Sequence, residues 1–162
     1  MYGKAQLTST AVLPGIRESC RIEGEYVLRI EDYLARRSFP DEIARNSYYL
    51  DQHLGADDDR AEKEGPGGFV NYSYDLGESH GIPYRCMLPK SLSNVIVAGR
   101  AISCTRIVQS STRIMPACLS IGEAAGIAAA MAADDGNVRG VDIPALQAKL
   151  LQYGAFIRPK RD

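Results

Sequence analysis

The sequence lacks the features that mark several large protein classes. No apolar run approaches the roughly 20 residues that a membrane-spanning helix needs. The N-terminus has no basic segment followed by an apolar stretch, as a signal peptide would have. The 19 lysines and arginines are offset by 20 aspartates and glutamates, and a net charge of −1 argues against nucleic acid as the main partner. We therefore expect neither a membrane nor a nucleic acid as a partner.

Close pairs of metal ligands are also missing. The four cysteines (Cys20, Cys86, Cys104 and Cys118) are widely spaced, and only two histidines accompany them. A structural zinc site usually shows close ligand pairs, so we expect no metal site. Widely spaced thiols without a framework pattern fit a reducing, cytoplasmic setting. We expect four free thiols that pack as small hydrophobic groups.

The chain length and composition are those of a globular protein. At 162 residues, with 45% hydrophobic and 24% charged residues, the chain fits one domain or one domain with an appendage. The patterns change along the chain, and the fold class they predict is mixed α+β. We divide the chain into a strand-rich segment, a strand followed by a helix, and a C-terminal helix with a tail, at residues 1–92, 93–134 and 135–162.

Strand-like patterns dominate the first segment. Alternation at 16–22, a turn at 23–25 and a return strand at 26–28 predict a hairpin. Acidic residues in a first turn predict a short helix at 31–37. Further strands are predicted at 43–53, 69–76 and 82–88. Residues 55–68 are polar and charge-rich, which predicts a solvated loop.

The second half of the chain is predicted to hold one buried strand and two helices. The apolar run at 95–98 suits a strand that is buried on both faces, as in a parallel sheet. A helix is predicted from Pro116 to about Ala133, with Gly136 placed to cap it. Asp142 and Gly154 bound a last helix, whose apolar stripe is Ile143, Leu146, Leu150 and Tyr153.

The start of the Pro116 helix is the first candidate for chemistry. Proline suits the first helical position, and Met115 before it has no side-chain oxygen to cap the helix. The amides of Ala117, Cys118 and Leu119 are then without helical partners. An uncapped, positive helix end favours an anion or a polarised carbonyl. The alternative is that water or a nearby side chain supplies the acceptors.

The body of this helix has almost no side-chain bulk. Gly122 and Gly126 each cost roughly 1 kcal/mol against alanine inside a helix. Close backbone approach to a sheet, another helix or a flat ligand would offset that cost. Tight packing without a ligand explains the pattern equally simply.

Two arginines flank the helix start in sequence. Arg100 follows Gly99 at the end of the predicted strand, and ligands of open α/β sheets bind beyond the carboxyl ends of strands. Arg113 lies just before the helix, and its fork of donors suits carboxylates and phosphates. The alternative for each is an ordinary ion pair.

Several motifs in order resemble one enzyme family. They are G-I-R-E-S at 15–19, R-I-E-G-E-Y at 21–26, I-P-Y-R-C-M-L-P-K at 82–90, N-V-I-V-A-G-R-A-I-S at 94–103, S-T-R-I-M-P at 111–116 and G-E-A-A-G-I-A-A-A at 122–130. From residue 15 to about 133 the chain resembles the C-terminal part of the FAD-dependent oxidoreductases related to the flavin subunits of succinate dehydrogenase and fumarate reductase and to heterodisulfide reductase.

The resemblance implies a role for each matching position. Gly99 and Arg100 would meet the ribityl or ribose region of FAD. The helix start at Met115, Pro116, Ala117 and Cys118 would point amides at N1 and the C2 carbonyl of the flavin, and Gly122 would belong to the same cofactor site. Arg113 would orient substrate or flavin, as the one catalytic candidate. Residues 1–92 would form a substrate-facing cap, and 93–134 the closing strand and helix of the FAD-binding domain.

The chain also departs from the family pattern. It has no G-x-G-x-x-G, and the nearest spacing, at 65–68, lies in the polar loop rather than between a strand and a helix. Many relatives have a histidine where this chain has Arg106. The resemblance therefore implies the C-terminal part of an enzyme that transfers hydride between a small-molecule substrate and FAD. That part would be inactive alone and would pair with an N-terminal half or form a homo-oligomer.

Two alternatives come from other classes. One is a non-catalytic binding or structural module that packs through its small-residue helix. The other is a cysteine-based enzyme that uses Cys118 at the helix start, where the pKa of the thiol would be lowered.

Overall fold

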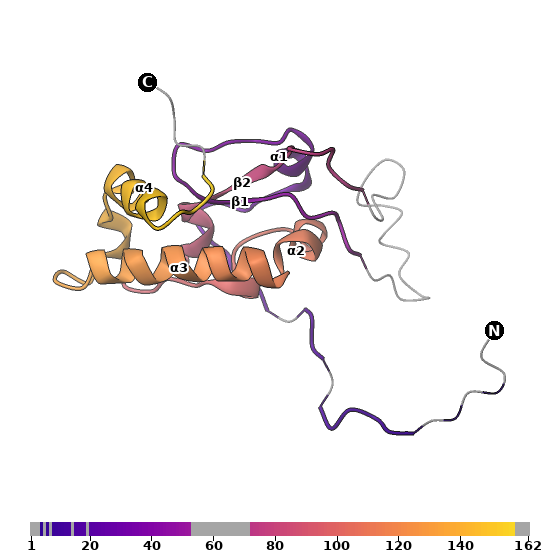
Figure 1. The fold of residues 1–162 in the computed structure, drawn as a ribbon. Helices are drawn as coiled ribbons and strands as arrows, with labels where there is room; N and C mark the ends of the chain where they lie inside the picture. The colour runs from indigo at the N-terminus through magenta and orange to yellow at the C-terminus, as the bar shows by residue number, and fades with distance from the viewer. Residues whose placement is uncertain are drawn as a thin grey trace.

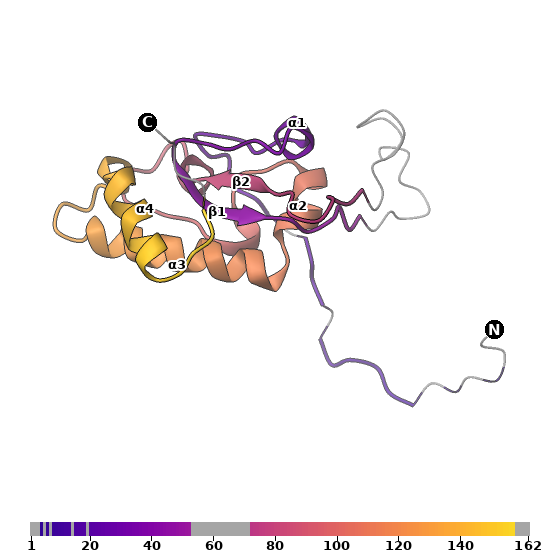
Figure 2. The ribbon, with the colours of Figure 1, turned by 45° about the horizontal axis from the view of Figure 1, so that its top comes forward.

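Helix α3 (Met115–Met131) is the longest element, and a small sheet packs beside it. The computed structural model describes residues 4, 6, 8–13, 15–18, 20–52 and 72–157. The predicted loop at 55–68, the glycines at 65–68 and the first part of the predicted strand at 69–76 lie outside these residues. Figures 1 and 2 show the sheet between α3 and the short helix α1 (Ile30–Leu34).

The sheet pairs β1 (Glu42–Asn46) with β2 (His80–Pro83) in antiparallel fashion. Arg45 lies opposite Gly81, and Asn46 lies opposite His80. Both strands are shorter than predicted. Pro83 has no N–H to continue a ladder, so residues 84–87 turn into a 3₁₀ helix, η1 (Tyr84–Met87). Beyond β1, the Tyr48 carbonyl accepts hydrogen bonds from the Tyr33 and Ser111 hydroxyls instead of from a neighbouring strand.

The hairpin predicted at 16–28 is wrong. Among the described residues of this stretch, the only pairings are isolated bridges from Gly24 to Pro89 and from Leu28 to Cys104. The Leu28 amide donates to the Ser103 carbonyl at 3.1 Å, and the Leu28 carbonyl accepts from the Thr105 amide at 2.9 Å. The two bridges join residues about 65 and 76 positions apart, so the segment pairs with distant chain rather than with itself, which local alternation does not reveal.

The buried strand predicted at 95–98 is also wrong. These residues have no regular secondary structure and are half-buried. Within the described chain their backbone makes one bond outside the run, from the Val97 amide to the Met87 carbonyl at 2.8 Å. A continuous apolar run becomes a central strand only where strands pair with it on both sides. The run leads into a 3₁₀ turn, η2 (Gly99–Ala101).

The predicted α3 is confirmed, beginning one residue before Pro116 and ending at Met131. Its buried face repeats at helical spacing and consists of Ala117, Ile121, Ala124 and Ala128. Gly136, with a φ of 66°, closes the C-terminal turn, and its amide donates to the Ala132 carbonyl. An unpredicted helix, α2 (Arg106–Thr112), precedes α3.

Helix α4 (Ile143–Gln152) is confirmed with its cap, because the Asp142 carboxylate accepts from the Ala145 amide at 3.1 Å. Leu146 and Leu150 are buried, whereas Tyr153 is exposed and does not belong to the stripe. Helix α1 is shorter than predicted, because Arg36 takes a left-handed backbone conformation with φ of 51°.

One hydrophobic cluster, from Leu28 to Ile157, joins the sheet, α3 and α4. The mixed α+β class is confirmed. In the part of the chain that the structure describes, no single helix has the length and apolar character to cross a membrane. One pair, α2 and α3, bent by 91°, meets the test by length and composition only.

Candidate functional site

Helix α3 begins without a side-chain cap, as predicted. Ile114 is the N-cap residue, and Met115 is the first helical residue. Because the helix starts one residue early, the Cys118 amide donates to the Ile114 carbonyl at 3.0 Å, and Leu119 lies inside the helix. The prediction that the Cys118 and Leu119 amides have no hydrogen-bond partner in the helix was therefore wrong. Among the described residues, the amides of Met115 and Ala117 have no acceptor.

Two clefts flank this helix start. The first, of about 460 Å³, is lined by Arg17, Asp51, Arg100, Arg113 and Met115, and we call it the arginine cleft. The second, of about 390 Å³, is lined by Asn46, Ser47, Tyr49, Ser73, Ala117 and Ser120, and we call it the hydroxyl cleft. Tyr48, Ile114 and Pro116 line both and form their common wall.

The predicted site residues do not all lie at one cleft. Arg100, Arg113, Met115 and Pro116 meet at the arginine cleft, although 13 positions separate the two arginines. Ala117 lines the hydroxyl cleft. Gly99, Cys118 and Gly122 line neither cleft.

Arg113 is held by two carboxylates rather than presented to the cleft as a free donor. Its guanidinium lies 2.9 Å from the Glu18 carboxylate, donates to the Asp51 carbonyl at 2.8 Å and lies 3.5 Å from the Asp51 carboxylate. Only 6% of the Arg113 side chain is exposed. The ion pair that we weighed as the alternative for Arg113 is therefore present.

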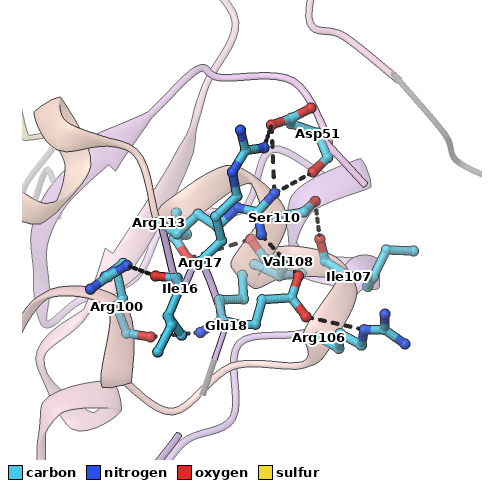
Figure 3. A network of polar contacts seen from close by, with 12 residues as sticks. Ile16, Arg17, Glu18, Asp51, Arg100, Arg106, Ile107, Val108, Ser110 and Arg113 are labelled. Atoms are coloured by element: carbon cyan, nitrogen blue, oxygen red, sulfur yellow. Dashed lines mark hydrogen bonds and ion pairs between the residues drawn. The ribbon is translucent and has the colours of Figure 1, made fainter. Parts of the chain in front are cut away.

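This pair belongs to a longer network, shown in Figure 3. Arg106 reaches the second oxygen of Glu18 at 3.3 Å, and Arg17 lies 3.8 Å from the Asp51 carboxylate. In the part of this network that the structure describes, three arginines thus lie against two carboxylates. Arg106, at the position where the resemblance implies a histidine, is paired with Glu18.

Arg100 approaches the same cleft from the η2 turn. Gly99 has a φ of 68°, which only glycine adopts without cost, and no atom lies within 4 Å of where its Cβ would be. The turn is held by Gln109, whose amide donates to the Arg100 carbonyl at 2.7 Å. The Arg100 guanidinium donates to the Ile16 carbonyl at 2.5 Å and remains exposed.

The lowered thiol pKa that the cysteine-enzyme alternative requires at Cys118 is not found. Burial raises the pKa of the Cys118 thiol, against a weaker opposing effect of the Arg100 charge. Its sulfur lies 3.8 Å from the Thr112 carbonyl. Burial also raises the pKa of Cys104, to about 11. All four cysteines are free, as predicted, and Cys118 is not activated.

The glycines of α3 face open space. No atom lies within 4 Å of a Cβ built on Gly122 or on Gly126. Met115 and Leu119 lie one turn apart near them and are 80% and 74% exposed. We call these four residues the outer face of α3. The close approach that we expected at the glycines is not made by the described part of this chain.

Sequence reasoning missed Tyr48 and Asp51 as cleft residues. It placed both in a strand, and no spacing relates them to α3. Arg21 and Arg85 line neither cleft and are paired elsewhere. Arg21 donates to Gln109 at 2.7 Å, and Arg85 makes two bonds to Asp41. Within the described residues, no group of three or more histidine, cysteine or acidic side chains is placed to hold a metal ion.

Comparison with known proteins gives one match. A family model described as FAD dependent oxidoreductase matches residues 1–150. Neither the curated proteins nor the solved structures contain a match to this chain.

Proposed function

This chain belongs to the FAD dependent oxidoreductase family, and from that premise we propose that it forms the flavin-ring side of an oxidoreductase active site. The ring would lie against the arginine cleft, at the uncapped start of α3. A bound FAD would supply the hydride chemistry, and the protein would supply positioning and electrostatics.

The observation that carries this proposal is the uncapped helix start beside Arg100. The amides of Met115 and Ala117 have no acceptor among the described residues, and the helix dipole places partial positive charge there. Arg100 adds a full positive charge at the same cleft. Together these groups fit the N1 and C2 carbonyl edge of a flavin, which becomes negative on reduction.

The chain fits one end of FAD and not the other. The sequence has no G-x-G-x-x-G turn to hold a pyrophosphate. We propose that the phosphates are held by another segment, an N-terminal half or a separate subunit, and that this chain alone binds flavin weakly. The substrate would be a small molecule that reaches the ring from the clefts.

Arg113 fits a positioning role in this scheme. Its bonds to Glu18 and Asp51 tie two segments of the chain to the residue just before α3. The arrangement fixes the backbone just before Ile114, at the wall of the cleft. Arg113 would therefore orient the substrate or the flavin through the field and shape of the cleft.

The outer face of α3 fits a contact surface. A helix that is apolar on all sides is usually buried on all sides, and Met115 and Leu119 are largely exposed here. We propose that the rest of the flavin-binding unit or a second copy of the chain covers this face.

The proposal is tested with the purified chain, FAD and one designed variant. Ile114→Asp places a carboxylate at the N-cap, where it accepts from the first-turn amides and stabilises α3 by about 1 kcal/mol. The same carboxylate occupies the edge that we assign to the flavin.

We expect FAD at high micromolar concentration to raise the melting temperature of the wild-type chain, because a ligand of the folded state alone adds RT ln(1 + [L]/Kd) to stability. Ile114→Asp should be more stable without FAD and lose the response, and Arg100→Gln should weaken it. Arg85→Gln, whose partner Asp41 lies outside the arginine cleft, is the control. No response in the wild-type chain, or an equal response in Ile114→Asp, would count against the flavin site and favour the non-catalytic module.

A further inference from the structure

The hydroxyl cleft has a lining unlike that of its neighbour. Its polar wall is built from the last residue of β1 and the residues that follow it, from a residue before β2 and from the first turns of α3. The side chains are three serines, two tyrosines and one asparagine: Ser47, Ser73, Ser120, Tyr48, Tyr49 and Asn46. All six are neutral donors or acceptors at pH 7.

The one ionic residue at this cleft is already neutralised. Arg45 has a fully buried side chain and lies 2.7 Å from the Glu42 carboxylate. Its remaining donors reach the Ser38 hydroxyl at 2.9 Å and the hydroxyl and carbonyl of Ser79 at 2.8 and 2.6 Å. Among the described residues, no carboxylate lines the cleft. An acidic ligand would therefore find no free cation here, and a basic ligand no anion.

The wall offers hydroxyls on a fixed frame. Asn46 is buried. Its side-chain NH₂ donates to the Ser111 hydroxyl at 2.7 Å, and its side-chain oxygen accepts from the Tyr48 backbone amide at 3.3 Å. Ser47 and Ser73 are exposed, and their hydroxyls have no partner in the described part of the chain. The rings of Tyr48 and Tyr49 stack at 4.3 Å. A flat aromatic surface beside free hydroxyls suits the two chemical faces of a sugar, its apolar C–H side and its hydroxyl rim.

We infer that the hydroxyl cleft binds a neutral polyhydroxylated group, a sugar ring or a polyol. The unpartnered hydroxyls of Ser47 and Ser73 and the absence of a free charge disfavour both an apolar ligand and an acid, while the Ser120 hydroxyl donates to the Pro116 carbonyl at 3.1 Å. The common wall of Tyr48, Ile114 and Pro116 puts this group next to the arginine cleft. As a binding site the inference stands on the lining alone, and its meaning as the substrate class rests on the proposed function.

The test is a titration of the full chain, followed by amide chemical shifts in NMR, with three probes of similar size. Methyl β-D-glucopyranoside is the neutral polyol, glucuronate its acidic counterpart and cyclohexylmethanol its apolar counterpart. We expect saturable shifts with the glucoside at millimolar concentration, and weaker binding of both counterparts. Ser73→Ala and Tyr49→Ala should each weaken glucoside binding about fivefold, as loss of a roughly 1 kcal/mol contact would. Ser91→Ala, an exposed serine outside the cleft, should leave it unchanged.

Three results would overturn the inference: no saturable shift with the glucoside, tighter binding of glucuronate or cyclohexylmethanol, or glucoside binding that both cleft variants leave intact. The FAD titration is independent of this one. Glucoside binding without FAD binding would remove the flavin proposal and leave the sugar site. FAD binding without glucoside binding would remove the sugar site and leave the flavin proposal.

Discussion

The guanidinium of Arg113 lies 2.9 Å from the carboxylate of Glu18, a residue 95 positions earlier in the chain. This contact fastens an N-terminal segment that has no regular secondary structure in its described residues to the start of the longest helix. The residue that the sequence offered as catalytic therefore also holds an ion pair.

Arg113→Gln should destabilise the chain by about 3 kcal/mol. The substitution removes the buried positive charge that pairs with the carboxylates of Glu18 and Asp51. Arg106→Gln is the matched control. It removes a second arginine from the same Glu18, but Arg106 is 43% exposed and lies at 3.3 Å, so the loss should be under about 1 kcal/mol. Urea unfolding of the two variants measures both values. Equal losses would mean that Arg113 is a surface pair like Arg106.

A pair of glycine substitutions should move stability in opposite directions. A Cβ on Gly81 would lie 2.1 Å from the carboxylate oxygen of Glu42, which is held in its buried pair with Arg45. Gly81→Ala should therefore cost about 3 kcal/mol. A Cβ on Gly122 meets nothing within 4 Å, so Gly122→Ala should gain about 1 kcal/mol of helix propensity. Thermal unfolding measures the two shifts, and a loss in Gly122→Ala would contradict an open outer face.

The helices could be predicted from sequence because their signals are local. Asp142 and Pro144 mark the start of α4, and small residues at helical spacing mark α3. The 95–98 run failed for the opposite reason. Its four apolar residues are typical of a central strand. A strand forms only where other segments of the chain pair with it, and among the described residues this run makes one backbone bond, to Met87.

Only part of the candidate site could be predicted, because only part of it is marked by local sequence signals. Arg100, Arg113 and Pro116 stood near a helix start that the sequence marks directly. Tyr48 and Asp51 reach the cleft because β1 packs against α3, a contact between segments about seventy residues apart. The hydroxyl cleft gathers Ser47, Ser73 and Ser120 from three such segments, and no spacing relates them.

Buried His80 should make stability depend on pH. Burial lowers the pKa of His80 to about 3. The positive charge of Arg45 adds to this effect, and the negative charge of Asp32 opposes it. An unfolded histidine titrates near 6.5, so between pH 6.5 and 3 the unfolded chain binds the extra proton. The free energy of unfolding should therefore fall as the pH drops through that window, by up to about 1.4 kcal/mol per pH unit from this group.

His80→Gln isolates that contribution, because glutamine keeps a polar partner for the Tyr74 hydroxyl, which lies 3.0 Å from the His80 ring. Urea midpoints of the two proteins should converge as the pH falls from 6.5 towards 4. Parallel curves would show that His80 is charged, or solvated, in the folded chain.

The outer face of α3 should control association without contributing to the fold. Leu119 is 74% exposed, so Leu119→Glu should change the free energy of unfolding by no more than about 0.5 kcal/mol. If a second copy covers this face, sedimentation velocity should show the wild-type chain associating with rising concentration and Leu119→Glu remaining monomeric. Leu151→Glu on α4 replaces another exposed leucine away from the outer face and should associate like the wild type. A wild-type chain that stays monomeric at all concentrations would mean that the flavin-binding segment, not a second copy, covers α3. Equal loss of association in both variants would remove α3 from the interface, because the added charge alone would then explain that loss.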